Sequence, residues 1–198
     1  MFSGGKFKVA DLPSVRRPEV SPPILLLLVI PFCTILLVGM LLYFVSVHIA
    51  LGNPYFSLSD SSVLVVGGGI LPIVVTWAIA TNRSWSNYLV ILQFFLIPWI
   101  VHAARPGFLG GSIGVLLWAI LMASIGLAVT SGTKRSRAYY RAISGKVVTE
   151  EDLASLTYST RWRNLVHRFA EVGPALELIA VILVLGTVAF AFLSSSIG

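Results

Sequence analysis

The side chains in this sequence that could bind an ion or exchange a proton lie inside long apolar runs. Glu177 is the third residue of a run at 175–195, and Gln93 lies near the middle of another at 85–104. An ionisable group at membrane depth usually faces a cavity, a partner charge or a proton path. We therefore interpret Glu177 as a candidate ion or proton site, with Gln93 as a candidate polar lining group. The alternative is that Glu177 reaches the membrane surface or pairs with an arginine, namely Arg83, Arg163 or Arg168.

Two histidines, His48 and His102, are near the ends of apolar runs. Two neutral imidazoles on facing helices can be the axial ligands of a b-type haem. The sequence does not tell whether these two helices are neighbours, and interfacial histidines without any metal are common. We expect no cofactor and no metal site, with haem b on His48 and His102 as the alternative.

Glycines mark places where helices can approach closely. Gly110 and Gly114 have the GxxxG spacing of a helix contact face. The same stretch matches the G-x-S-x-G pattern around Ser112, but that pattern supports nucleophilic chemistry only on a strand-to-helix elbow. Here it opens an apolar run, so we predict helix packing at these positions and at the glycines of the second run, Gly67, Gly68 and Gly69.

The usual signatures of enzymes are missing from the sequence. It has no phosphate-binding loop, HExxH, CxxC or dinucleotide fingerprint, and its single cysteine, Cys33, rules out a multi-cysteine zinc site. The formal net charge is +6, yet the basic residues stand beside apolar runs rather than on the face of a soluble domain. We predict that the chain has no catalytic residues, is not an enzyme and does not bind nucleic acid.

The composition indicates that lipid surrounds most of the chain. Of its 198 residues, 57% are hydrophobic and 11% are charged, whereas soluble domains have about 25% charged residues. A membrane-spanning helix needs about 20 apolar residues. We therefore predict an all-α membrane protein with five transmembrane helices, the first of which must tilt, kink at Pro31 or project from the bilayer. They cover about 24–50, 63–80, 85–104, 110–130 and 175–195.

The distribution of Lys and Arg predicts the orientation of these helices. Positive residues are enriched on the cytoplasmic side of membrane proteins. With the N terminus inside, the tail 1–23, the turn at Arg83 and the segment 131–174 hold 13 of the 14 basic residues, and only Arg105 lies outside. We therefore predict a cytoplasmic N terminus and an external C terminus, with residues 175–198 forming the fifth helix and a short external end.

The segment 131–174 is predicted to be cytoplasmic and to contain short helices. A basic helix is expected at 134–143, and Thr149 followed by Asp152 resembles a helix N-cap. Farther on, apolar residues recur at helical spacing while arginines fall on the other face. This pattern predicts an amphipathic helix that lies on the inner leaflet or docks a partner protein. Its residues are Arg161, Trp162, Arg163, Leu165, Arg168 and Phe169.

These features together favour a non-catalytic, multi-pass subunit of a larger assembly in a bacterial inner membrane. Its surroundings would be the lipid bilayer and either other membrane proteins or further copies of itself, in a secretion, transport or energy-converting complex. Two alternatives stay open. One is an ion or proton channel subunit that uses Glu177, and the other is a haem-carrying electron-transfer anchor.

Overall fold

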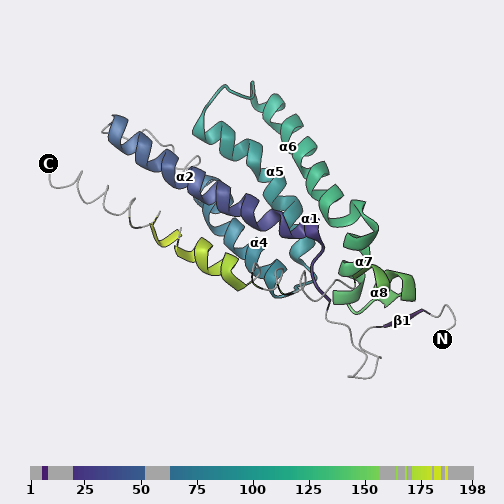
Figure 1. The fold of residues 1–198 in the computed structure, drawn as a ribbon. Helices are drawn as coiled ribbons and strands as arrows, with labels where there is room; N and C mark the ends of the chain where they lie inside the picture. Colours follow the sequence, from purple (N-terminus) through teal and green to yellow (C-terminus); the bar gives the residue numbers. More distant parts are fainter. Residues whose placement is uncertain are drawn as a thin grey trace.

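The computed structural model describes residues 6–8, 20–51, 63–156, 164, 168, 171–179, 181–183 and 186, with backbone alone for residues 7, 44, 45 and 47–51. This part of the chain is mostly helical, with one short strand pair and turns between the helices. It contains four helices long and apolar enough to cross a membrane, which lie side by side (Figure 1). The all-α fold and four apolar helices agree with the sequence prediction. The helices cover Ile24–Tyr43, Val63–Ala80, Ser86–Ala104 and Ser112–Gly132.

The first long helix is interrupted near its start. Helix α1 (Ile24–Leu27) and helix α2 (Val29–Leu51) meet at Leu28, which is in a turn. Pro31 explains the interruption because it has no N–H for the carbonyl of Leu27, and its ring pushes that carbonyl aside. The interruption lies one turn before Pro31, the residue at which the sequence allows a kink.

The second long helix begins with a widened turn. A π-helical segment, η3 (Val66–Ile70), leads directly into α4 (Leu71–Ala80). Pro72 stands in the first turn of α4 and cannot donate a backbone hydrogen bond. A π-type turn shifts the bonding pattern by one residue, which accommodates the missing donor.

The glycines of η3 lie where three helices meet. Gly67, Gly68 and Gly69 are all buried. A Cβ atom at Gly67 would be 3.1 Å from the Ile100 side chain, and one at Gly68 would be 2.7 Å from the Met40 sulfur. Glycine therefore allows η3 to pack closely on its two neighbours.

The third and fourth long helices form an antiparallel hairpin (Figure 1). They are α5 (Ser86–Ala104) and α6 (Ser112–Leu127), and α6 continues into a second π-helical segment, η4 (Ala128–Gly132). The two helices touch at Gly126, where a Cβ atom would be 3.1 Å from the Cα of Ile91.

The chain after η4 folds back against one end of the bundle, which we call the α7 end. It forms α7 (Lys134–Ile143), strand β2 (Val147–Val148) and α8 (Glu150–Leu156). Strand β1 (Phe7–Lys8) pairs with β2 in antiparallel register. The N-terminal tail and the segment after the fourth long helix therefore meet at the same end of the molecule.

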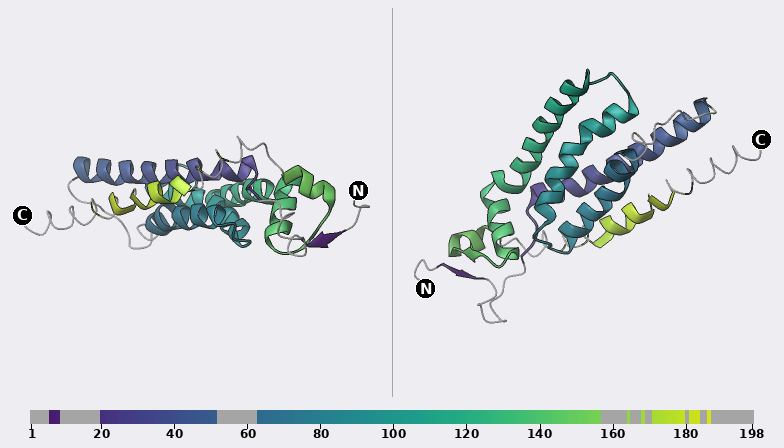
Figure 2. Two further views of the ribbon diagram at one scale, coloured as in Figure 1. Left: turned by 60° about the horizontal axis from the view of Figure 1, so that its bottom comes forward. Right: turned by 180° about the vertical axis from the view of Figure 1, so that it is seen from behind.

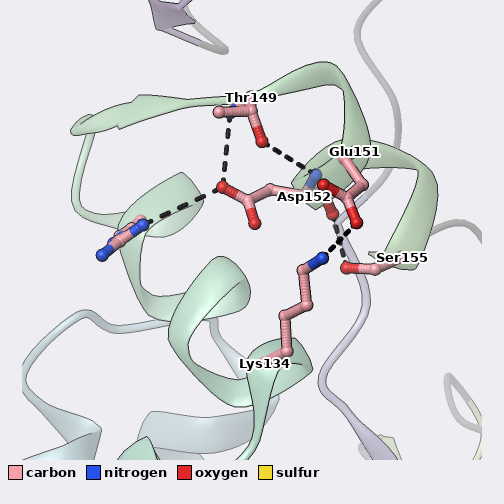
Figure 3. A network of polar contacts seen from close by, with 6 residues as sticks. Lys134, Thr149, Glu151, Asp152 and Ser155 are labelled. Carbon is pink, nitrogen blue, oxygen red and sulfur yellow. Dashed lines mark hydrogen bonds and ion pairs between the residues drawn. The ribbon is translucent and has the colours of Figure 1, made fainter.

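The start of α8 is capped as its sequence predicts. Thr149 accepts a hydrogen bond from the Asp152 backbone N–H at 3.2 Å, and Asp152 accepts one from the Thr149 N–H at 3.3 Å. Such a reciprocal pair satisfies two backbone donors at a helix start. An ion pair between Lys134 and Glu151 links α8 to α7 (Figure 3).

The last described helical stretch, 171–179, lies beside α2 and α4 in both views of Figure 2. It covers the beginning of the predicted fifth transmembrane helix. Of the remainder of that prediction, residues 181–183 and 186 are also helical, and the rest lies outside the described residues.

Candidate functional site

The carboxyl group of Glu177 is enclosed by three helices. Its side chain has no exposed surface in the described structure. Thr34 of α2 lies 3.2 Å from Oε1 of Glu177, and Thr76 of α4 is the second hydroxyl beside the carboxyl group. Gly173, one turn before Glu177, permits this contact, because a Cβ there would be 2.9 Å from Ile30 and 3.2 Å from Thr76.

The hydroxyl group of Thr34 has two neighbours but only one proton. Its oxygen lies 3.1 Å from the backbone carbonyl of Ile30 and 3.2 Å from Oε1 of Glu177. With an ionised carboxylate, Thr34 donates to Glu177. With a protonated carboxyl group, Glu177 can donate to Thr34, which then donates to Ile30. Rotation of one hydroxyl group therefore serves both protonation states of Glu177.

The second carboxyl oxygen is not satisfied. Within the described residues, Oε2 of Glu177 has no hydrogen-bond donor, and the Thr76 hydroxyl donates to the Pro72 carbonyl at 3.0 Å. A buried polar atom without a partner is costly, so it marks either a binding position or a strained site. Glu177 thus retains an open acceptor inside the bundle.

No arginine neutralises Glu177 in the described part of the chain. The only ion pairs found there join Lys134 to Glu151 and Arg141 to Asp152. Arg83 instead stacks on the Trp77 ring at 5.3 Å. The structure therefore shows no pair of Glu177 with Arg83 or Arg168, whereas Arg163 lies outside the described residues.

An apolar groove leads to this site from the surface. It has a volume of about 510 Å³ and lies between α2 and the stretch 171–179. Thr34 lines the groove and also contacts Glu177, so one side chain separates the groove from the carboxyl group. Arg168 is exposed and also lines the groove.

Gln93 is buried in a different environment. Its Nε2 donates to the Gly67 carbonyl at 3.0 Å, and its Oε1 has no partner among the described residues. The hydrogen bond joins α5 to the widened turn η3. Among the described residues, Gln93 and Glu177 have no hydrogen-bond partner in common.

The two histidines belong to helices that come close at the end opposite α7. Tyr43 of α2 donates a hydrogen bond of 2.8 Å to the Ala104 carbonyl of α5. His102 is near that contact, and its Nδ1 is buried without a partner among the described residues. The backbone of His48 is in the last turn of α2, but its side chain lies outside the described structure. Haem ligation by this pair stays a prediction.

The glycines at the start of α6 have a local role. Gly110 has a φ of +82°, which glycine adopts without strain. A Cβ atom at Gly114 would be 2.4 Å from the Leu109 carbonyl, so the turn itself requires glycine. Neither position contacts another described helix within 4 Å. Packing of this face against a partner stays a prediction.

The predicted amphipathic helix lies mostly outside the described residues. Arg161, Trp162, Arg163, Leu165 and Phe169 are all outside them. Arg168 is described, and it is helical and exposed. Its place at the apolar groove connects the end of this segment with the surroundings of Glu177.

Two tyrosines that the sequence interpretation overlooked attach α7 to the bundle. The Tyr139 hydroxyl donates to Oδ1 of Asn82 at 2.7 Å, and the hydroxyls of Tyr140 and Ser86 are 3.0 Å apart. Burial raises the pKa of Tyr140 to about 12, although the hydrogen bond with Ser86 opposes this shift. Burial and the adjacent Tyr140 raise the pKa of Tyr139 further. Both hydroxyls are therefore neutral and bridge α7 to the start of α5.

Comparison with known protein families, with curated proteins and with solved structures finds no match to this chain. The class defined by the fold is that of helical proteins with several apolar helices of membrane-spanning length. The function must therefore be argued from the site.

Proposed function

We propose that this chain is a five-span membrane protein of a bacterial inner membrane in which Glu177 takes up and releases protons as part of a transport or energy-converting assembly. The observation that carries the proposal is the enclosed carboxyl group of Glu177, with one oxygen on Thr34 and the other without a donor among the described residues. Ionisable side chains in transmembrane helices are costly and usually functional.

The surroundings of Glu177 favour proton exchange over a fixed ion pair. No described cation holds the carboxylate in one charge state, and Thr34 can bond to either form. The apolar groove adjoins Thr34, which contacts the carboxyl group. This site lies about 6 Å along α4 from Ala80, because Thr76 is four residues from that helix end and a helix rises 1.5 Å per residue.

The proposed topology has the α7 end in the cytoplasm. The charge distribution supports this orientation, because 13 of 14 basic residues then stay inside. The β1–β2 pairing supports an even number of crossings between its strands, since it requires residues 7–8 and the segment after α6 to be on one side of the membrane. The fifth span then crosses outward from residue 175.

Proton flux into liposomes tests the role of Glu177. The full chain is reconstituted with a pH-sensitive dye inside, and a potassium gradient with valinomycin drives the flux. We expect Glu177→Gln to abolish proton entry, because an amide cannot exchange a carboxyl proton. Glu171→Gln is the matched control, since Glu171 is an exposed carboxyl group on the same helical stretch. Wild-type flux no greater than in empty liposomes, or unchanged flux in Glu177→Gln, contradicts the proposal.

A second candidate function is that of a non-catalytic assembly subunit, and the α5–α6 hairpin favours it. Only 22% of the 18-residue apolar stretch in each of these two helices is buried inside the bundle, compared with 56% for Val63–Ala80. The outer face of α6 exposes large apolar side chains that suit a partner helix as well as lipid. They include Ile113, Leu116, Leu117, Trp118 and Leu121.

Purification in a gentle detergent distinguishes an assembly subunit from a monomeric protein. We expect the chain to elute with other copies or with a partner when it is purified in a gentle detergent and its mass is measured by light scattering. A monomer without any co-purifying protein contradicts the assembly function, and it leaves the flux experiment on Glu177 unaffected.

A further inference from the structure

A second cavity lies at the α7 end of the bundle and shares no lining residue with the groove near Glu177. Its volume is about 320 Å³, and it lies between the start of α5, η4 and α7. Three cations line it, namely Arg137, Arg141 and Lys146. No Asp or Glu is among its lining residues.

The positive charge in this cavity is largely uncompensated. Arg137 and Lys146 are exposed and form no ion pair with a described carboxylate. Arg141 approaches Asp152 only at 3.9 Å. The other acidic residues nearby belong to α8, where Glu151 is occupied by Lys134. The cavity therefore attracts an anion.

The start of α5 adds to this attraction. Ser84, Trp85 and Asn87 line the cavity, and Trp85 is the N-cap of α5. This cap offers no side-chain acceptor, and the first turn contains no acidic residue. A helix start carries partial positive charge, which favours phosphate.

The cavity also contains polar groups that can contact a headgroup. The exposed Ser84 lines the cavity, and Oδ1 of Asn87 is buried without a donor among the described residues. A headgroup that carries a hydroxyl group can supply that donor. Tyr88 and Trp85 line the same cavity and are 70% and 40% exposed. Such aromatic residues are typical of the level of lipid headgroups.

We propose that this cavity binds the phosphate of an anionic headgroup, with Arg137 and Lys146 as its principal charge partners. Guanidinium and phosphate groups form paired, charge-assisted hydrogen bonds, which gives Arg137 the larger part in orienting the ligand. This proposal rests on the proposed topology, in which the α7 end lies at the membrane surface. It does not involve Glu177.

Native mass spectrometry of the full chain in detergent tests this proposal. The chain is titrated separately with phosphatidylglycerol, with diacylglycerol, which lacks phosphate, and with glycerol 3-phosphate. We expect phosphatidylglycerol to bind and diacylglycerol not to. The double variant Arg137→Gln/Lys146→Gln is expected to weaken binding about tenfold or more, because each lost charge-assisted hydrogen bond is a strong one.

The matched control removes the same charge elsewhere. Lys8→Gln/Arg105→Gln neutralises two cations that do not line the cavity and is expected to change binding less than twofold. Arg137→Lys/Lys146→Arg keeps the charge and is expected to retain most of the binding, which separates recognition from misfolding. Glu177→Gln is expected to bind as the wild type does, so the two proposals fail independently.

The outcomes distinguish the source of the phosphate. Binding of phosphatidylglycerol without glycerol 3-phosphate identifies a lipid site, whereas binding of both identifies a site for phosphate esters in general. Either result supports the proposal when the Arg137/Lys146 variant alone loses binding. Equal losses in the control variant, or equal binding of diacylglycerol, overturn it.

Discussion

Substitution of Thr34 gives the most direct test of the proton-exchange hypothesis. Its hydroxyl is shared between Ile30 and Glu177, and it lies 3.2 Å from Oε1, whereas Oε2 has no donor among the described residues. If proton exchange depends on this contact, loss of the hydroxyl must disfavour the ionised carboxylate while leaving the carboxyl group in place.

We expect Thr34→Val to reduce proton flux without abolishing it. The loss of one hydrogen bond to a charged group costs about 1.5–3 kcal/mol, which corresponds to roughly a 10- to 150-fold lower population of the ionised form. Thr34→Ser keeps the hydroxyl and is expected to retain flux. The measurement is the liposome assay, and equal flux in the valine and serine variants contradicts this role of Thr34.

Tyr140 predicts a pH dependence of stability at the α7 end. Its folded pKa of about 12 exceeds the unfolded value of about 10. A raised pKa means that the folded state keeps its proton longer, so this stability is present below about pH 10 and is lost as the pH rises towards 12. The expected loss is about 2 kcal/mol.

Thermal unfolding of the detergent-solubilised chain between pH 9 and 12 measures this effect, and tyrosinate absorbance follows the ionisation. In Tyr140→Phe we expect a shallower pH dependence, with Tyr139 responsible for the remainder, and about 1 kcal/mol lower stability at neutral pH from the lost Ser86 contact. An unchanged pH profile in the phenylalanine variant contradicts the assignment to Tyr140.

Helix contacts that depend on glycine can be tested at the level of elements. Gly126 lies where α6 crosses α5, and a Cβ there would be 3.1 Å from the Ile91 backbone, which cannot rotate away. We expect Gly126→Val to destabilise the hairpin by about 1–3 kcal/mol, as overpacking usually does. Gly39→Val is the control, because position 39 of α2 has open space around it. Helicity followed during heating in detergent measures both variants, and equal effects at the two positions are the contrary result.

The elements were the most predictable level of this protein. Apolar runs of membrane-spanning length locate the first four long helices because length and hydropathy decide that state without tertiary information. The cap of α8 was likewise predictable from Thr149 and Asp152, because an N-cap depends only on residues that are close in the sequence.

The site was less predictable because it depends on contacts between distant segments. Glu177 stood out as a charge in an apolar run, but its partner Thr34 is 143 residues away and looked like an ordinary span residue. The alternative of an arginine partner for Glu177 is not seen for Arg83 or Arg168, because charge alone does not tell which helices face each other. Gln93 was expected beside a path, whereas a carbonyl of the widened turn η3 accepts its hydrogen bond, and that turn has no simple sequence signal.

At the scale of the whole molecule, the proposed topology predicts which residues an impermeant reagent can reach. With Cys33 replaced by alanine, single cysteines are placed at Lys8, Lys146 and Phe108. We expect only Phe108→Cys to react with an impermeant maleimide in intact cells, and the other two to react in inside-out vesicles. Phe108 is 62% exposed, so lack of labelling from outside contradicts the orientation.

The fifth span has its own test in the same background. With four spans the C terminus faces inward, and with five it faces outward, because each crossing reverses the chain. We therefore expect Gly198→Cys to be labelled in intact cells together with Phe108→Cys. Labelling of Gly198→Cys only in inside-out vesicles would show that the stretch after 174 does not cross.

The pairing of β1 with β2 has a consequence for biogenesis. Residues 7 and 8 leave the ribosome before the long helices, yet their partners at 147 and 148 follow only after all four long helices have been synthesised. Strand β1 therefore lacks its partner strand until those helices have been synthesised. In the proposed topology, a chain with one skipped helix has β1 and β2 on opposite sides of the membrane, so this strand pair can close only after all four helices have inserted.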